Sequence, residues 1–119
     1  RCVIEKRDIV LHTSGLSERM YLYVYDAIEA MFYVLLKGKN GNAYNVANKD
    51  TYCSIKEMAE LVKKITNNSI DVQIQIDSQI GKKYPPTHYW YLETEAIEEL
   101  GWKPRINLEE MYRRLIESF

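Results

Sequence analysis

The chain has 119 residues, 46% of them apolar, which is enough for one modest core and too little for two ordinary domains. Its 16 basic and 17 acidic residues leave a net charge of -1, which argues against nonspecific binding to nucleic acid or to a membrane surface. The longest apolar run, residues 31–36, is far shorter than a membrane span, and no signal-peptide pattern opens the chain, so we expect a soluble cytoplasmic protein.

The first half of the chain alternates strand and helix signals. The β-branched run at residues 8–12, which ends at the turn-forming residues 13–15, predicts a strand. A helix is predicted from Asp26, which we expect to cap it. Apolar side chains surround most of this helix, which predicts deep burial, and Gly38 is expected to end it in the left-handed conformation. Residues 43–47 then predict a second strand.

The second half begins with the strongest helix signal in the chain. Ser54 opens a Ser-x-x-Glu capping box, and apolar residues follow it at helical spacing. Apolar and polar residues alternate over 70–76, which predicts a strand with one buried face. The paired prolines within 82–89 predict an extended loop, and two short helices are predicted over 94–100 and after Asn107. This order predicts an α/β or α+β fold, a small mixed sheet with packed helices.

Four segments resemble motifs of a known family, in the family's order. They are the Arg-x-aromatic-x-Tyr-Val-x-Asp segment at 19–26, the Tyr-Asn-Val strand at 43–48, the helix start at Ser54, and the Leu-Gly-Trp-x-Pro block at 100–104. In these motifs the chain resembles the C-terminal, substrate-binding region of the extended short-chain dehydrogenase/reductases, the NAD-dependent nucleotide-sugar epimerases and dehydratases. The resemblance implies that residues 1–119 form one substrate-binding domain, a fragment of a longer enzyme whose N-terminal Rossmann half is absent from this sequence.

The resemblance also implies what the parent enzyme does. It would bind NAD(P) on the Rossmann domain and a nucleotide-diphosphate sugar against this region, and it would catalyse epimerisation, 4,6-dehydration, decarboxylation or reduction. The chain has no Gly-x-Gly-x-x-Gly fingerprint, so we expect no cofactor in it and no activity from it alone. The sequence does not choose among these reactions, and it leaves a homodimer possible. The alternative is a noncatalytic interaction module derived from the family, which the absence of the family's loop aspartate favours slightly.

A few residues are candidates for substrate binding. Arg19 stands where the family's arginine contacts the substrate diphosphate, and a guanidinium binds phosphate oxygens bidentately; the alternative is a surface salt bridge. Lys82 or Lys83 could replace a loop arginine as a point charge, and Tyr84 could stack on a base or sugar ring; the alternative for the lysines is a solvated basic turn. Ser54 caps its helix, and that helix N-terminus could also face an anion.

Other patterns carry no catalytic or metal prediction. The Tyr-x-x-x-Lys patterns at 33–37 and 52–56 imitate the family's acid/base pair, but neither stands in its place, and we expect both to be chance. Two cysteines and two histidines give no metal-ligand spacing, so we expect no metal site and two reduced thiols. Asn45 is expected to tie its strand to a neighbouring loop.

Overall fold

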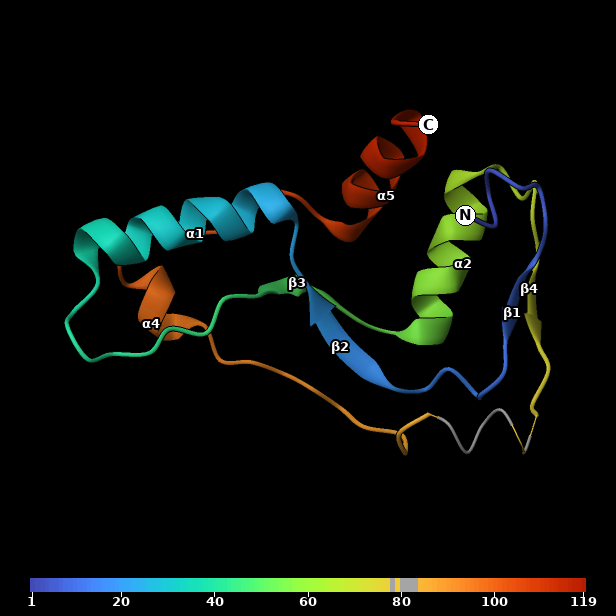
Figure 1. Cartoon of the computed structure of the whole chain (residues 1–119), viewed down its shortest axis with the longest axis horizontal. Coiled ribbons are helices and arrows are strands. Elements are labelled where there is room, and N and C mark those ends of the chain that lie inside the picture. The colour runs from blue at the N-terminus through green and yellow to red at the C-terminus, as the bar shows by residue number, and fades with distance from the viewer. Residues whose placement is uncertain (78, 80–83) are drawn as a thin grey trace.

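The fold was examined in a computed structural model that describes residues 1–77, 79 and 84–119. The molecule is elongated and flat, with extents of 48 × 33 × 18 Å (Figure 1). Its elements, in chain order, are β1 (Ile9–Leu11), β2 (Glu18–Tyr21), α1 (Val24–Lys37), β3 (Asn48–Ser54), α2 (Ile55–Ile65), β4 (Val72–Ile74), α4 (Glu95–Glu98) and α5 (Leu108–Glu117). None of the described helices is long and apolar enough to cross a lipid bilayer.

Within the described residues the strands form two small sheets. β1 pairs in parallel with β4, with Ile9 opposite Val72. β2 pairs antiparallel with β3, with Glu18 opposite Ser54, and the register shifts between Arg19 and Tyr21. The predicted class, a small mixed α/β arrangement with packed helices, is therefore confirmed, and its parallel and antiparallel pairs lie in separate sheets.

The strand predicted over residues 43–47 is wrong. β2 takes β3 as its partner, so the hydrogen-bonded ladder begins only at Asn48. Side-chain bonds hold the preceding segment instead, since Tyr44 Oη accepts a hydrogen bond from the backbone N–H of Lys39 at 2.9 Å. The hydrogen bond predicted for Asn45 is confirmed, although the segment that it holds is not a strand: its amide donates to a carbonyl oxygen of the segment before α4 at 3.1 Å.

The ends of α1 differ from the prediction. The helix begins at Val24, and the N-cap position is held by Tyr23, which makes no side-chain capping bond. Gly38 ends the helix with φ -66°, which is not the left-handed conformation we expected. Glycine is required there by close approach, because a Cβ at Gly38 would lie 2.4 Å from the carbonyl oxygen of Val34.

Asp26 connects α1 to the Leu-Gly-Trp-x-Pro block instead of capping the helix. It is fully buried, and its Oδ2 accepts hydrogen bonds from the backbone N–H groups of Arg105 and Ile106 at 3.1 and 3.0 Å. The indole of Trp102, also fully buried, donates to the Asp26 carbonyl oxygen at 3.1 Å. Together with Ala30, these contacts build the main core around the inner side of α1.

The remaining predicted elements form, although some are shorter. The helices expected over 94–100 and after Asn107 correspond to α4 and α5, and the Asn107 side chain accepts from the third backbone N–H of α5. The strand predicted over 70–76 shortens to β4. Its expected buried face is covered only at the start, since Ile70 is buried whereas Ile76 is largely exposed.

Candidate functional site

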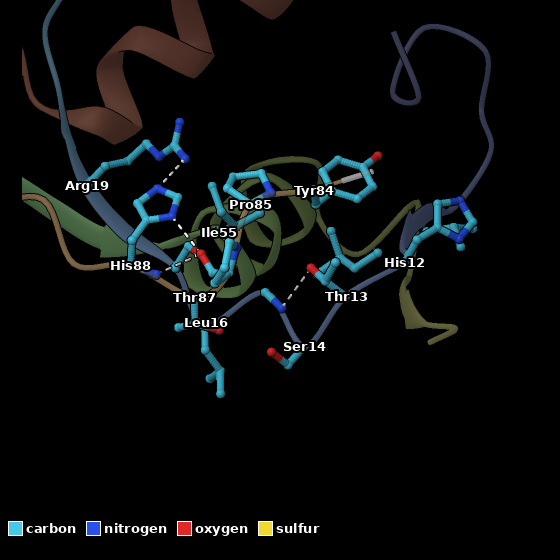
Figure 2. A pocket seen from close by; sticks show the side chains of 15 residues that line it. His12, Thr13, Ser14, Leu16, Arg19, Ile55, Tyr84, Pro85, Thr87 and His88 are labelled. Atoms are coloured by element: carbon cyan, nitrogen blue, oxygen red, sulfur yellow. Dashed lines mark hydrogen bonds between the residues drawn. The ribbon is translucent and has the colours of Figure 1, made fainter. Parts of the chain in front are cut away.

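A cavity of about 640 Å³ lies where the loop after β1, the start of β2 and the segment 84–88 meet. Figure 2 shows Arg19 and His88 together on one side of it, with Thr13 and Tyr84 on the other. One side therefore presents a cation and an imidazole, and the other presents an aromatic ring and a hydroxyl. Such a volume is within the range of pockets that take small ligands.

Backbone hydrogen bonds bring these distant segments together. Glu18 at the start of β2 donates its N–H to the carbonyl of His88 at 2.9 Å and accepts from the N–H of Trp90 at 3.0 Å. The loop before β2 is held to α2, because the N–H of Lys56 donates to the Gly15 carbonyl at 3.0 Å. Gly15 has φ +68°, and a Cβ there would approach Lys56 to 3.1 Å, so this turn depends on glycine.

One hydrogen bond, to His88, holds the Arg19 side chain, and its Nε has no partner among the described residues. Its Nη2 lies 3.0 Å from Nε2 of His88. Arginine has only donors, so that imidazole nitrogen accepts, and Nδ1 of His88 carries the proton and donates to the Pro86 carbonyl at 2.9 Å. The buried Nε of Arg19 has no hydrogen-bond partner among the described residues. No ion pair within that part of the chain involves Arg19, so the alternative of a salt bridge finds no support there.

The other predicted site residues are only partly brought together. Tyr84 lines the cavity and is 53% exposed. Lys82 and Lys83 lie outside the described residues. Ser54 is 5% exposed and does not line this cavity; its neighbour Ile55 does. Contact between Ser54 and a substrate therefore stays a prediction from sequence alone.

The helix-capping role predicted for Ser54 is confirmed. Its Oγ accepts from the N–H of Glu57 at 3.1 Å, and the Glu57 carboxylate accepts from the N–H of Ser54 at 2.7 Å. The hydrogen bond from the backbone N–H of Ser54 is the main cause that lowers the pKa of the Glu57 carboxyl, and a hydrogen bond with the Ser54 side chain is the second cause. These two bonds satisfy donors at the start of α2, beside the loop that carries the cavity.

Replacement of Ser54 by alanine should lower the free energy of unfolding by about 1 kcal/mol. Because the folded-state pKa of Glu57 is lowered, its share of this stability is present above the ordinary carboxyl pKa and is lost as pH falls through the folded value. The backbone N–H of residue 54 remains in Ser54→Ala, so only the smaller side-chain part of this pKa shift is lost, and the difference in stability from wild type should shrink in acid by that part alone, as measured by urea unfolding. Ser69→Ala, at an exposed serine, is the control; equal losses in both variants would contradict this role.

Sequence reasoning missed two histidines of the cavity. His88 contacts Arg19 across 69 positions of the chain, and no spacing rule reports a contact of that length. His12, directly after β1, also lines the cavity, and its Nδ1 is buried without a hydrogen-bond partner in the described part of the chain. A histidine two residues after a proline pair was the only available signal for His88, and it is a weak one.

Side chains of both Tyr-x-x-x-Lys patterns make contacts other than a tyrosine–lysine catalytic pair. Lys37 Nζ donates to the carbonyl of Leu100 at 3.2 Å and lies 4.8 Å from the centre of the Tyr33 ring. A hydrogen bond with the Glu18 carboxylate raises the pKa of Tyr52 to about 12. The raised pKa makes loss of the Tyr52 proton harder than for an ordinary tyrosine, which is unfavourable for an acid/base catalyst.

The described residues offer no metal cluster. They contain no group of three or more His, Cys, Asp or Glu side chains that could hold a metal ion. A dinucleotide cradle needs a parallel strand that turns directly into a helix N-terminus. β1, one strand of the parallel pair, runs into strand β2 and does not form such a cradle; residues 78 and 80–83, which follow β4, lie outside the described residues. The wall of the cavity that carries Arg19 is cationic and has an unpaired N–H among the described residues, so it is chemically complementary to an anionic group.

Comparison with known proteins relates the chain to nucleotide-sugar dehydratases and epimerases. A model of the family described as GDP-mannose 4,6 dehydratase matches residues 2–115. The chain is 32% identical over 116 residues to dTDP-D-glucose 4,6-dehydratase of Mus musculus, covering 95% of this chain and 32% of that protein. It thus spans about a third of the length of this curated relative.

Solved structures show the same fold. The crystal structure of dTDP-glucose 4,6-dehydratase from Bacillus anthracis in complex with NAD superposes with a TM-score of 0.77 at 20% identity, covering 98% of this chain and 35% of that one. UDP-glucose 4-epimerase from Thermotoga maritima, solved with UDP-glucose, gives a TM-score of 0.77 at 18% identity, covering 98% and 37%. At these identities the likeness establishes the fold.

Proposed function

Because the chain belongs to the GDP-mannose 4,6 dehydratase family, we propose that it is the substrate-binding part of an NAD(P)-dependent nucleotide-sugar epimerase or dehydratase. In this proposal it holds the diphosphate of a nucleotide-linked sugar. The observation that carries it is the Arg19 guanidinium, which faces a cavity of about 640 Å³ with its Nε unpaired among the described residues.

The chemistry of Arg19 suits a diphosphate. A guanidinium keeps its charge at any physiological pH and offers a planar fork that matches phosphate oxygens. His88 holds one edge of this fork at 3.0 Å, which limits the rotation of the side chain before the ligand arrives. A diphosphate can then bind the remaining N–H groups, and Tyr84 across the cavity offers a ring face to the base or to the sugar.

The names of the similar proteins support this substrate class. One relative is a dTDP-D-glucose 4,6-dehydratase, and one structural neighbour is an epimerase solved with UDP-glucose. Hydride transfer in the proposed parent enzyme belongs to NAD(P), held by an N-terminal Rossmann domain. The role of this chain is to bind and orient the substrate, and we assign it no residue that transfers a proton or hydride.

Calorimetric titration of the chain with dTDP-glucose, UDP-glucose, GDP-mannose and CDP-glucose tests the proposal. Saturable binding of at least one of them, with glucose alone failing to bind, is the expected result, because the diphosphate carries the recognition. Absence of binding at millimolar concentration from a well-folded chain would contradict the proposal and would favour a noncatalytic interaction module derived from the family.

His88→Ala should weaken binding of the preferred nucleotide sugar roughly tenfold, because the Arg19 guanidinium loses the bond that orients it. His88→Gln should lose less, since an amide oxygen can still accept from Arg19. Calorimetric titration measures both, and chemical unfolding checks that the variants fold alike. Unchanged affinity in His88→Ala would remove His88 from the site.

A further inference from the structure

The C-terminal end of α1 and the turn that follows it are exposed to solvent. The sequence predicted deep burial all around this helix, and that prediction is wrong for the chain alone, because only Asp26 and Ala30 of α1 are buried. Residues 39–43, which follow the helix, are all exposed. Figure 1 shows this turn at one end of the long axis of the molecule, with β1 and β4 at the other end.

Asn40 and Gly41 are the two central residues of this turn. The N–H of Asn42 donates to the carbonyl of Lys39 at 3.2 Å, and Gly41 has φ +80°. A glycine with positive φ at the third position is typical of a type II turn. Asn-Gly occurs nowhere else in the sequence. The fold therefore places the one asparagine–glycine pair of the chain at an exposed tip.

An asparagine that precedes a glycine can lose its side-chain amide without an enzyme. The backbone nitrogen of Gly41 attacks Cγ of Asn40, the new N–Cγ bond closes a succinimide ring, and the Cγ–Nδ2 bond breaks. The proton of the Gly41 nitrogen leaves with Nδ2 as ammonia. Water then opens the ring at either carbonyl, which gives aspartate or isoaspartate. Water is the only co-reactant, and no group is oxidised or reduced.

The attacking nitrogen of Gly41 is unobstructed. A Cβ at Gly41 would meet nothing within 4 Å, so no neighbouring group fills the space beside this residue. Among the described residues, neither the N–H of Gly41 nor the side-chain amide of Asn40 makes a hydrogen bond. The bond between Lys39 and Asn42, at 3.2 Å, is at the long end of the usual range. Ring closure therefore disturbs little of the folded structure.

Two other asparagines lack this freedom. Asn68 precedes Ser69, but the N–H of Ser69 donates to the Thr66 carbonyl at 3.1 Å and is not free to attack. Asn48 is only 3% exposed, and its amide nitrogen donates to a backbone carbonyl at 3.0 Å. The folded structure therefore protects both of these positions and leaves Asn40 open to the reaction.

We propose that Asn40 is a deamidation site, at which the folded chain accumulates aspartate and isoaspartate. This inference is independent of the proposed function, because no residue of the turn lines the cavity. Isoaspartate inserts a methylene group into the backbone beside Lys39, whose N–H donates to Tyr44 Oη at 2.9 Å. Tyr44 packs against the core that contains Trp102. The isoaspartyl form should therefore unfold at a lower urea concentration than the original chain.

Peptide mapping of the chain during storage, at neutral and at mildly alkaline pH, tests the proposal. Mass spectrometry measures the conversion of each asparagine, and an isoaspartyl methyltransferase labels the isoaspartyl product. Asn40 should convert at least tenfold faster than Asn68, and faster at alkaline pH, because the attacking nitrogen must lose its proton. The urea-unfolded chain is the reference. Conversion first at Asn68, or folding that slows conversion of Asn40 more than tenfold, would overturn the proposal.

Two variants connect the reaction to its consequence. Asn40→Gln should abolish conversion at this position, because closure of the larger glutarimide ring is far slower. Asn68→Gln is the matched control and should leave conversion of Asn40 unchanged. After storage, wild type should contain a fraction that unfolds at lower urea, and Asn40→Gln should not. The same loss of stability in both proteins would contradict a structural effect of deamidation at Asn40.

Discussion

Arg19→Ala is expected to weaken binding of the preferred nucleotide-diphosphate sugar about 100-fold. A hydrogen bond from a charged donor contributes about 1.5–3 kcal/mol, so the loss of two at the lower value removes about 3 kcal/mol, and each 1.4 kcal/mol is a factor of ten. Donors for two bonds remain because His88 engages one N–H of the guanidinium at Nη2 and Nε is unpaired among the described residues. Calorimetric titration measures the change.

Two variants make this prediction specific. Arg19→Lys keeps the charge but loses the bidentate geometry, so its affinity should fall between those of wild type and Arg19→Ala. Arg113→Ala removes an arginine that pairs with Glu109 on α5, away from the cavity, and should leave binding unchanged. Equal losses in Arg19→Ala and Arg113→Ala would mean that only overall charge matters.

Asp26→Ala is expected to lower the free energy of unfolding by about 3 kcal/mol. The substitution leaves the backbone N–H groups of Arg105 and Ile106 without their acceptor, and each unsatisfied donor costs about 1–3 kcal/mol when water cannot replace the bond. It also opens a small cavity beside the buried Trp102. Urea unfolding followed by tryptophan fluorescence measures the loss.

Two further variants separate this bond from a general effect of charge. Asp26→Asn keeps one oxygen acceptor in nearly the same shape and should lose markedly less stability than Asp26→Ala. Glu29→Ala, on the same helix, breaks a surface ion pair with Arg105 and should cost less than 1 kcal/mol. If Asp26→Ala lowered the free energy of unfolding no more than Glu29→Ala does, the hydrogen bonds from Asp26 to residues 105 and 106 would not contribute to stability.

The parts of the fold with local signals were predictable from the sequence. The capping box at Ser54 is satisfied within four residues, and it correctly predicted the start of α2. Strand pairing was harder to predict. The segment 43–47 is rich in β-forming residues, yet β2 pairs with β3 instead, through bonds that span about thirty positions of the chain. Asp26 illustrates the same limit, since the two backbone N–H groups that donate to its carboxylate lie 79 and 80 positions away in the chain.

The residues of the candidate site likewise fall into those that the sequence predicted and those that it did not. Arg19 was predictable because a motif surrounds it, and Tyr84 because it follows a basic pair in a proline-rich loop. The partner of Arg19, His88, was not predictable from spacing, because only the backbone bonds between Glu18 and the 88–90 segment bring it close. The apolar composition of α1 was informative in another sense. It indicated burial that this chain alone does not provide.

An amide-shift NMR titration of the chain with the preferred nucleotide sugar tests the central claim most directly, because it reports where the ligand binds. The account predicts saturable shifts at Arg19, residues 13–17 and residues 84–88, which line the cavity, and their loss in Arg19→Ala. Shifts confined to other surfaces, or no shifts at millimolar ligand in a well-folded chain, would contradict a diphosphate site at Arg19.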